Sequence, residues 1–363
     1  MKIVTVLGAR PQFIKAASVS NILRKEHEEI IIHTGQHYDY NMSEQFFKEL
    51  NIPNPKYNLG ISGGTHAQMT GKMMMAIEEV LMKETPDLLL VYGDTNSTLA
   101  AALTSAKLHI PICHVEAGSR THNKDNPEEM NRICTDHLSA LLLASTETAL
   151  IEMQKEGISD RGYFVGDPMY DAFVCFRDKA SKKKVCLDLL NGMNCSVPEQ
   201  FYYLTCHREE NTSNDEKLLQ IFYALNELDA PTVYPVHPRN KKRAIKLVEQ
   251  YKLSNLILAE PVGYLDSIFL VQNAKKIITD SGGLQREAFF AGKQCVTVLD
   301  FVVWPETMID NRNQLARPEK DDLLLKLSKE QKIDYSYQPF GDGKAGQKIL
   351  REINNFFERG KLK

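Results

Sequence analysis

Short apolar runs alternate with longer amphipathic stretches along nearly the whole chain, and this alternation limits the possible folds more than any other feature. Apolar runs of about four to eight residues are typical of strands buried on both faces of a parallel sheet. The longer stretches have the spacing of helices that cover such a sheet. The chain is therefore predicted to be an α/β protein built from repeated strand–helix units.

The expected elements fall into two groups. Strands are expected at 2–7, 29–34, 87–92, 110–115, 140–145 and 162–165 in the first half, and at 201–206, 232–236, 255–258, 275–279 and 294–299 in the second. Helices are expected at 12–25, 66–83, 97–107, 128–138, 214–228, 239–251 and 283–291. The alternation lapses between Gly166 and about Pro198. We therefore predict two doubly wound Rossmann-like domains.

The length of the chain supports this division, because 363 residues are too many for one ordinary core. We expect an N-terminal domain over residues 1–170 that carries acid–base carboxylates, and a C-terminal nucleotide-binding domain over 171–343. The segment 344–363 contains an amphipathic helix that we expect to cross back to the first domain. Ligands of open α/β sheets lie beyond the carboxyl ends of the strands, so a ligand is expected in an interdomain cleft.

Composition disfavours several classes of protein. With 44 basic and 47 acidic residues, the formal charge of −3 provides no field for nucleic acid or an anionic membrane. The opening apolar run is too short for a signal peptide and no stretch is long enough to span a membrane, so we expect a cytoplasmic protein. The seven cysteines lack paired metal-ligand spacing, and we expect reduced thiols and no metal site.

Three carboxylates come at one edge of the first predicted sheet. Asp94 and Glu116 follow or end apolar runs, and Glu128 opens the next helix. Removing a weakly acidic proton from a carbon atom and replacing it on the opposite face requires more than one positioned acid or base. Singly, Asp94 would serve equally well as a helix cap and Glu128 as a partner of a helix dipole. Together they predict proton-transfer chemistry.

The first expected strand leads into a helix start that carries two cations. Pro11 suits the first turn, and Arg10 and Lys15 would bracket an amino end where backbone N–H groups favour an anion. The simpler interpretation is a tight turn with two solvated cations. The spaced glycines of a dinucleotide fingerprint are absent from this turn, which disfavours a nicotinamide or flavin enzyme.

The second half offers a phosphate site. Ser281, Gly282 and Gly283 form a turn between an apolar run and a helix-forming segment. Glycines there allow backbone amides to approach a diphosphate, and Glu287 can accept hydroxyl donors of a ribose. A plain helix cap explains the same residues equally well.

Imidazoles and cations follow two strands of the second half. His207 ends one apolar run, and His237 and Arg239 end the next. These groups can neutralise a leaving diphosphate. One histidine alone is more often structural, but two at equivalent strand ends favour a functional site. Together with the carboxylates of the first half, they predict chemistry on a phosphorylated ligand.

In their order along the chain, these motifs resemble the non-hydrolysing UDP-N-acetylglucosamine 2-epimerase family. The resemblance covers nearly the whole chain and rests on the segments 8–11, 34–37, 93–97, 114–118, 127–132, 166–171, 207–209, 237–239, 260–266, 279–283 and 304–307. It implies a two-domain glycosyltransferase-B-like fold, a homodimer, and no nicotinamide or metal requirement. The implied activity interconverts UDP-N-acetylglucosamine and UDP-N-acetylmannosamine. UDP is eliminated to an enzyme-bound 2-acetamidoglucal and is added back after a proton reaches the other face.

The resemblance also implies roles for individual residues. By motif, Asp94, Glu116 and Glu128 are the acid–base carboxylates, and His207 assists the departing diphosphate. The substrate-binding residues are expected to be Arg10, Lys15, His237, Arg239, Ser281, Gly282, Gly283 and Glu287. The expected biological role is to supply a surface polysaccharide pathway.

The chain departs from the family pattern at two places. Many members have an arginine-aspartate-x-threonine-glutamate stretch where this chain has residues 299–303, and Ser267 stands where an aromatic residue near the uracil is common. The motifs at 8–12 and 166–171 look closer to relatives acting on modified sugars such as UDP-2,3-diacetamido-glucuronate. The alternatives are therefore an epimerase of such a sugar, a hydrolysing epimerase that releases N-acetylmannosamine and UDP, a glycosyltransferase, or a sugar-nucleotide sensor.

Overall fold

A computed structural model describes residues 1–36, 47 and 49–361. The chain forms two compact units, and we call Met1–Val174 with Gln338–Lys363 unit 1 and Cys175–Tyr337 unit 2. Helix α7 (Pro168–Ser181) runs through the division between them. His37, which belongs to the motif at 34–37, lies outside the described residues. Within the described part of the chain, no helix is long and apolar enough to cross a membrane.

The sheet of unit 1 has seven parallel strands in the order β3-β2-β1-β4-β5-β6-β7. Their bounds are β1 Lys2–Leu7, β2 Glu28–His33, β3 Tyr57–Asn58, β4 Leu88–Tyr92, β5 Ile112–Ala117, β6 Leu141–Ala144 and β7 Gly162–Phe164. The strand order reverses between β1 and β4. In doubly wound sheets the crevice at such a reversal is where ligands bind.

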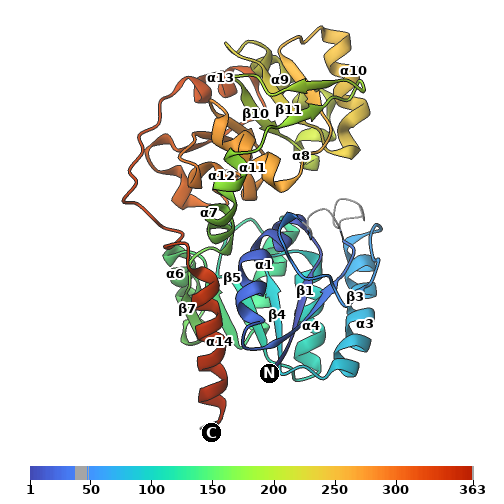
Figure 1. The fold of residues 1–363 in the computed structure, drawn as a ribbon, viewed down its shortest axis with the longest axis vertical. Helices are drawn as coiled ribbons and strands as arrows, with labels where there is room; N and C mark the ends of the chain where they lie inside the picture. Colours follow the sequence, from blue (N-terminus) through green and yellow to red (C-terminus); the bar gives the residue numbers. More distant parts are fainter. Residues whose placement is uncertain (37–46, 48, 362–363) are drawn as a thin grey trace. The chain divides into compact units, whose positions relative to one another are not determined.

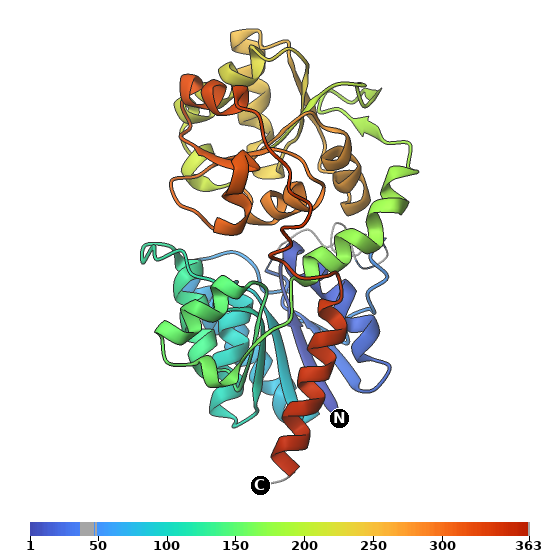
Figure 2. The same ribbon diagram turned by 90° about the vertical axis from the view of Figure 1, so that its left-hand side faces the viewer.

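The helices of unit 1 cover this sheet. Among the described residues they are α1 (Arg10–Leu23), α3 (His66–Glu84), α4 (Asn96–Lys107), α5 (Pro127–Leu138), α6 (Glu147–Lys155) and α14 (Ala345–Lys361), with the short η1 (Ser159–Arg161) and the first part of α7. Side chains of α3 and α4 form one core with apolar residues of β1, β2 and β4. The C-terminal α14 packs beside α1, and Figure 2 shows it as the red helix that ends at C.

The sheet of unit 2 has six parallel strands in the order β12-β11-β10-β13-β14-β15. Their bounds are β10 Tyr202–Thr205, β11 Thr232–Pro235, β12 Leu256–Ala259, β13 Ile277–Thr279, β14 Cys295–Val298 and β15 Asn313–Ala316. Here the strand order reverses between β10 and β13, and the hydroxyls of Thr205 and Thr279 lie 2.6 Å apart at their ends.

Helices cover both faces of this second sheet (Figure 1). One core contains α9 (Asp215–Asn226), α10 (Lys241–Tyr251) and α13 (Lys320–Ser328) with Tyr202 and Leu204, and the other contains α11 (Tyr264–Asn273) and α12 (Gly282–Phe290) with Tyr203. The remaining helical turns are α8 (Glu209–Thr212), η2 (Pro238–Asn240) and η3 (Pro305–Asn311). Side chains of successive strand residues point to opposite faces of the sheet, and helices cover each face. The unit is therefore doubly wound.

The structure confirms the predicted α/β class. Each expected strand and helix is present, with ends shifted by at most about two residues. The sequence reading missed β15 and several helices, and it treated the segment after Gly166 as a lapse. That segment holds α7 and an antiparallel pair, β8 (Cys186–Asp188) with β9 (Asn194–Ser196). These strands are short and lack a long apolar run, so periodicity does not reveal them.

Candidate active site

The reversal edge of unit 1 gathers carboxylates around one guanidinium. Arg132 of α5 forms an ion pair with Asp94 through Nη2, and its Nη1 lies 3.0 Å from Oε2 of Glu129. Burial would lower the pKa of Arg132, but the charges of Asp94, Glu129, Glu116 and Glu128 act in the opposite direction and the pKa is raised. The three carboxylates expected from the sequence therefore all act on the charge of one buried cation, and Asp94 contacts it directly.

A second buried cation lies against Glu116. Nζ of Lys15 is 2.7 Å from Oε2 of Glu116, and the two side chains are 3% and 7% exposed. Gly93, directly after β4, adopts a φ of 63°, and a Cβ there would lie 3.2 Å from Nζ of Lys15 and 3.4 Å from Oε1 of Glu116. Lys15, which we expected to hold nucleotide or sugar, holds a carboxylate in this structure.

The backbone of Glu116 is itself unusual. Its φ is 69°, in the left-handed region that residues other than glycine rarely adopt. The pairing of β5 with β6 also shifts register between Val115 and Ala117, so Glu116 lies at a β-bulge. Bulges re-aim side chains, and strained residues persist only where the surrounding structure holds them.

The caps of the two nearby helices come from residues other than the expected carboxylates. Thr95, and not Asp94, caps α4, and its side chain accepts a hydrogen bond from the N–H of Thr98 at 3.3 Å. The interpretation of Asp94 as a helix cap is therefore wrong, because its carboxylate pairs with Arg132. Asn126 caps α5 and accepts from the N–H of Glu128 at 3.0 Å, which places Glu128 in the first turn.

The amino end of α1 is already occupied by a side chain of the same helix. Oε1 of Gln12 accepts from the N–H groups of Gly8 and Ala9 at 2.7 and 3.0 Å, and its Nε2 donates to the carbonyl of Tyr92 at 2.8 Å. Gln12 thus ties α1 to β4 and takes two of the donors that we expected to face an anion. Arg10 begins the helix and is half-buried.

In unit 2, the carboxylate of Asp280 organises the end of β10. Its Oδ2 accepts from the N–H groups of His207 and Arg208 at 2.9 and 2.8 Å, and its Oδ1 lies 3.0 Å from Nδ1 of His207. Burial would raise the pKa of Asp280, but the charge and hydrogen bonds of His207 and the N–H of Arg208 lower it to about 2. An ionised carboxylate therefore orients the His207 ring.

The other expected residues of β10 and β11 join His207. The rings of His207 and His237 are stacked with centroids 6.3 Å apart, and Nη2 of Arg239 donates to the carbonyl of His207 at 2.9 Å. The structure therefore brings together the imidazoles and one cation that follow these neighbouring strands.

The glycine turn of unit 2 begins α12 at the neighbouring strand end. Ser281 caps this helix and accepts from the N–H of Leu284 at 3.4 Å, while Gly282 and Gly283 form its first residues. Glu287 follows within the helix and is buried. Ser281 thus does serve as a helix cap, and its position at the switch point of the sheet is also a position where anions bind.

The loop that departs from the family pattern packs on this turn. A Cβ on Gly282 would lie 3.3 Å from Cγ1 of Val303 and 3.5 Å from Nε1 of Trp304. The guanidinium of Arg208 lies over the ring of Phe301, 5.5 Å from its centroid. The loop therefore borders both the glycine turn and the segment that carries His207.

Sequence reasoning missed two organising residues, Arg132 and Asp280. Arg132 ends the motif at 127–132, and Asp280 lies within the motif at 279–283. The i,i+3 spacing of Glu129 and Arg132 on a helix was an available signal. No such signal in the sequence marked Asp280, because its hydrogen-bond partners follow a different strand.

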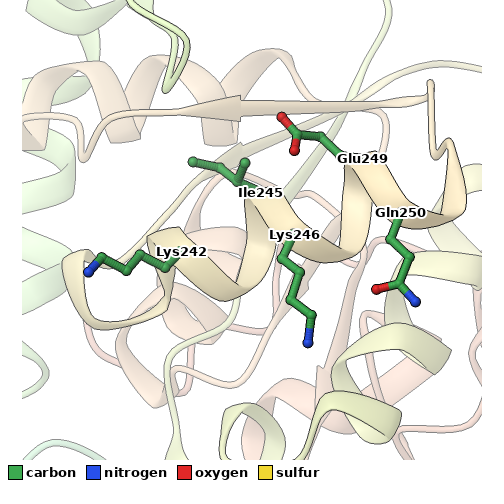
Figure 3. Close-up of a pocket in the computed structure, with 5 residues that line it drawn as sticks. All are labelled: Lys242, Ile245, Lys246, Glu249 and Gln250. Carbon is green, nitrogen blue, oxygen red and sulfur yellow. The ribbon is translucent and has the colours of Figure 1, made fainter.

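A shallow hollow elsewhere on unit 2 holds none of these groups. Figure 3 shows its lining, which comes from α10 alone: Lys242, Ile245, Lys246, Glu249 and Gln250. One exposed helix face without converging polar groups lacks the features of a catalytic site.

Comparison with known proteins agrees with the fold and the motifs. The family profile described as UDP-N-acetylglucosamine 2-epimerase matches residues 21–354. A UDP-N-acetylglucosamine 2-epimerase homolog of Methanococcus maripaludis is 47% identical, over 98% of this chain and 100% of the relative. The UDP-2,3-diacetamido-2,3-dideoxy-D-glucuronate 2-epimerase of Pseudomonas aeruginosa is 43% identical, over 97% of this chain and 99% of the relative.

A solved structure extends this similarity to three dimensions. The crystal structure of Methanocaldococcus jannaschii UDP-GlcNAc 2-epimerase in complex with UDP-GlcNAc and UDP has a TM-score of 0.88 and 39% identity, with 98% of this chain and 100% of that chain covered. The protein is thus an α/β enzyme of the glycosyltransferase-B-like fold class. More narrowly, the chain belongs to the UDP-N-acetylglucosamine 2-epimerase family, whose enzymes are isomerases.

Proposed function

We propose that this protein interconverts UDP-N-acetylglucosamine and UDP-N-acetylmannosamine without releasing free sugar. The observation that carries the proposal is the pairing of Asp94 with Arg132 and of Glu116 with Lys15 at the end of one sheet, with Glu128 in the first turn of the helix that carries Arg132. A reaction that removes a proton from one face of a sugar carbon and returns it to the other needs several acid–base groups near one ring. A simple glycosyl transfer has no comparable need for three carboxylates.

The proposed reaction has two halves. A base takes the proton from carbon 2, the electron pair of that C–H bond forms the double bond to carbon 1, and the bond from carbon 1 to the diphosphate oxygen breaks. UDP leaves and 2-acetamidoglucal stays bound. A proton then reaches carbon 2 from the opposite face while UDP adds back to carbon 1. Arg132 and Lys15 supply positive charge beside Asp94 and Glu116, which offsets repulsion between the carboxylates.

The residues of unit 2 are proposed to hold and stabilise the nucleotide. His207, oriented by Asp280, would donate a hydrogen bond to the departing diphosphate. The amino end of α12, with Ser281 to Gly283, suits a phosphate. Glu287 would accept the ribose hydroxyls, and the remaining contacts are assigned to His237 and Arg239 of unit 2 and to Arg10 of unit 1. A homodimer and a cytoplasmic location stay predictions.

Exchange of the carbon-2 proton tests this proposal directly. The protein is incubated with UDP-N-acetylglucosamine in heavy water, and the sugar is followed by NMR. We expect UDP-N-acetylmannosamine to form with deuterium at carbon 2 in both epimers. Accumulation of free N-acetylmannosamine and UDP would instead indicate a hydrolysing epimerase. Tight binding of the nucleotide sugar with no exchange would contradict an epimerase of this sugar and favour a sensor.

A second substrate deserves the same experiment, because the Pseudomonas aeruginosa relative named for UDP-2,3-diacetamido-2,3-dideoxy-D-glucuronate is 43% identical to this chain. The altered loop at 299–303, with Val303 against Gly282, lies where a different sugar substituent could be recognised. We expect kcat/KM for UDP-N-acetylglucosamine to exceed that for the diacetamido-glucuronate. The reverse order would assign the protein to the modified sugar.

A further inference from the structure

A histidine that no step of the proposed reaction uses is completely buried behind the carboxylates of unit 1. His114 lies in β5 with a side chain that is 0% exposed, and its partner Asp136 on α5 is equally buried. Nδ1 of His114 is 2.6 Å from Oδ1 of Asp136, and Nε2 is 2.7 Å from the carbonyl oxygen of Gly93.

The hydrogen-bond partners of His114 determine how its ring nitrogens are bonded. A carbonyl oxygen can only accept, so Nε2 donates to Gly93. Oδ2 of Asp136 also accepts from the N–H of Gly118 at 3.0 Å and from Nη1 of Arg120 at 2.8 Å. Burial would raise the pKa of Asp136, but His114 and Arg120 lower it, which keeps a carboxylate there. Nδ1 therefore shares one hydrogen bond with Oδ1 of Asp136, and the ring is held at both nitrogens.

These bonds reach each element that carries a site carboxylate. Gly93 directly precedes Asp94, Gly118 stands two residues after Glu116, and Asp136 lies on the helix that carries Glu128. Arg120 extends the network to the carboxylate of Glu156 on the surface side, through bonds of 2.7 and 2.8 Å.

Stability is a weak reason for such an arrangement. A buried ion pair often contributes no more to folding than apolar side chains of similar volume, because both charges lose their hydration. The pair does fix positions, because its bonds hold the Gly93 carbonyl after β4 and the Gly118 N–H after β5, and Asp136 ties both to α5. In a proton-transfer site, a displacement of about 1 Å can lower the rate on the order of 100-fold.

We propose that His114 and Asp136 are positioning residues that hold Asp94, Glu116 and Glu128 in one catalytic geometry. The inference rests on the proposed function. It assigns no contact between His114 and substrate, so the pair acts through the backbone of Gly93 and Gly118. Its loss should lower kcat and leave KM for the nucleotide sugar nearly unchanged, because the nucleotide is proposed to be held by residues of unit 2.

Three variants of His114 separate its two bonds. In His114→Asn the amide can replace Nδ1 and donate to Asp136, whereas in His114→Gln it can replace Nε2 and donate to Gly93. His114→Leu removes both bonds and fills the space. The control is Thr104→Ala in α4, which removes a buried hydroxyl bonded to the carbonyl of Ala100 at 2.8 Å, away from the carboxylates.

We expect His114→Leu to lower kcat roughly 100-fold, with partial rescue in the Asn and Gln variants and KM within about twofold of the wild type. Thr104→Ala should keep the wild-type kcat despite a lower melting temperature. The inference is overturned if His114→Leu turns over at the wild-type rate. It is also overturned if the three variants lose activity only in proportion to their folded fraction.

A second measurement depends on neither turnover nor the folding of a variant. In wild-type protein labelled with ¹⁵N-histidine, we expect one buried ring whose Nε2 carries a slowly exchanging hydrogen bonded to the carbonyl of Gly93. A His114 ring without hydrogen on Nε2 would overturn the inference. Failure of the proposed function has a different signature, namely wild-type protein that binds a UDP-sugar without exchanging its carbon-2 proton.

Discussion

At the scale of single residues, Glu116 carries the clearest marks of function. Its left-handed backbone costs roughly 1–2 kcal/mol for a residue other than glycine, and it lies at a register shift in β5. The buried ion pair with Lys15 does not offset that cost by itself, since such pairs contribute little net stability. A strained and buried carboxylate is therefore better explained by chemistry than by folding.

Glu116→Gln should separate a role of Glu116 in proton transfer from a role in folding. The amide keeps the shape and an acceptor for Lys15, but it cannot take a proton. We expect kcat to fall on the order of 100- to 10,000-fold with UDP affinity little changed, and a lower melting temperature because Lys15 keeps a buried charge without its counter-ion. The control is Glu147→Gln, an exposed residue in the first turn of α6. Near-normal turnover of Glu116→Gln would remove this residue from the mechanism.

Gly93→Ala tests the packing around the Lys15–Glu116 pair. Both Gly93 and Gly157 have positive φ, at 63° and 72°, so alanine at either position should cost about 1 kcal/mol of stability. Only at Gly93 would the new Cβ press on Lys15, because nothing lies within 4 Å at Gly157. We expect thermal unfolding to show similar losses and steady-state kinetics to show reduced turnover for Gly93→Ala alone. Equal activity of the two variants would contradict this role of Gly93.

At the scale of elements, each unit concentrates its polar groups where the strand order reverses. In unit 1 these are the ends of β1 and β4 with neighbouring β5, and in unit 2 the ends of β10 and β13. The α12 helix begins at the second reversal, so its free backbone N–H groups and its dipole both favour an anion there. Position in the sheet, together with the glycines, is what makes this helix start the proposed phosphate site.

Ser281→Ala should therefore weaken both the helix and the nucleotide site. Loss of the cap costs about 1 kcal/mol of stability, and we expect a several-fold weaker Kd for UDP by calorimetry. The matched control is Thr65→Ala, which removes the cap of α3 in unit 1, where the side chain accepts from the N–H of Gln68 at 3.3 Å. If both variants keep the wild-type Kd, Ser281 serves only the helix.

At the scale of the whole molecule, the chain leaves unit 1 within α7 and returns to it at Gln338. The two passages are bonded to each other inside unit 1, because the N–H of Asp167 donates to the carbonyl of Phe340 at 2.9 Å. The single tryptophan, Trp304, belongs to unit 2 and is buried. Its fluorescence therefore reports the unfolding of that unit.

Asp280 should make the stability of unit 2 depend on pH. Its pKa falls from 3.8 to about 2 on folding, so its carboxylate stabilises the folded state above pH 4 by about 2 kcal/mol. This contribution is lost as the pH falls through the window between 3.8 and 2. We expect urea unfolding followed by Trp304 fluorescence to show a gap between wild type and Asp280→Asn that narrows from pH 5 to pH 3.

The control for this titration is a carboxylate of unit 1. Hydrogen bonds from Lys56 and Tyr57 lower the pKa of Glu84 to about 2 as well. Glu84→Gln should leave the pH dependence of the Trp304 signal unchanged. A gap between wild type and Asp280→Asn that stays constant with pH would show that the carboxylate does not titrate in this window.

The sequence by itself determined the class of fold, the ends of the main strands and helices, and the family. These follow from local periodicity and from the order of motifs, which depend only on neighbours along the chain. It also pointed to Asp94, Glu116 and Glu128, because carboxyl ends of parallel strands share one edge. Only the tertiary structure decided which cation forms an ion pair with which carboxylate. The members of each pair are distant in sequence, so their pairing depends on how the strands are ordered in each sheet. The pairs are Lys15 with Glu116, Arg132 with Asp94, and His207 with Asp280.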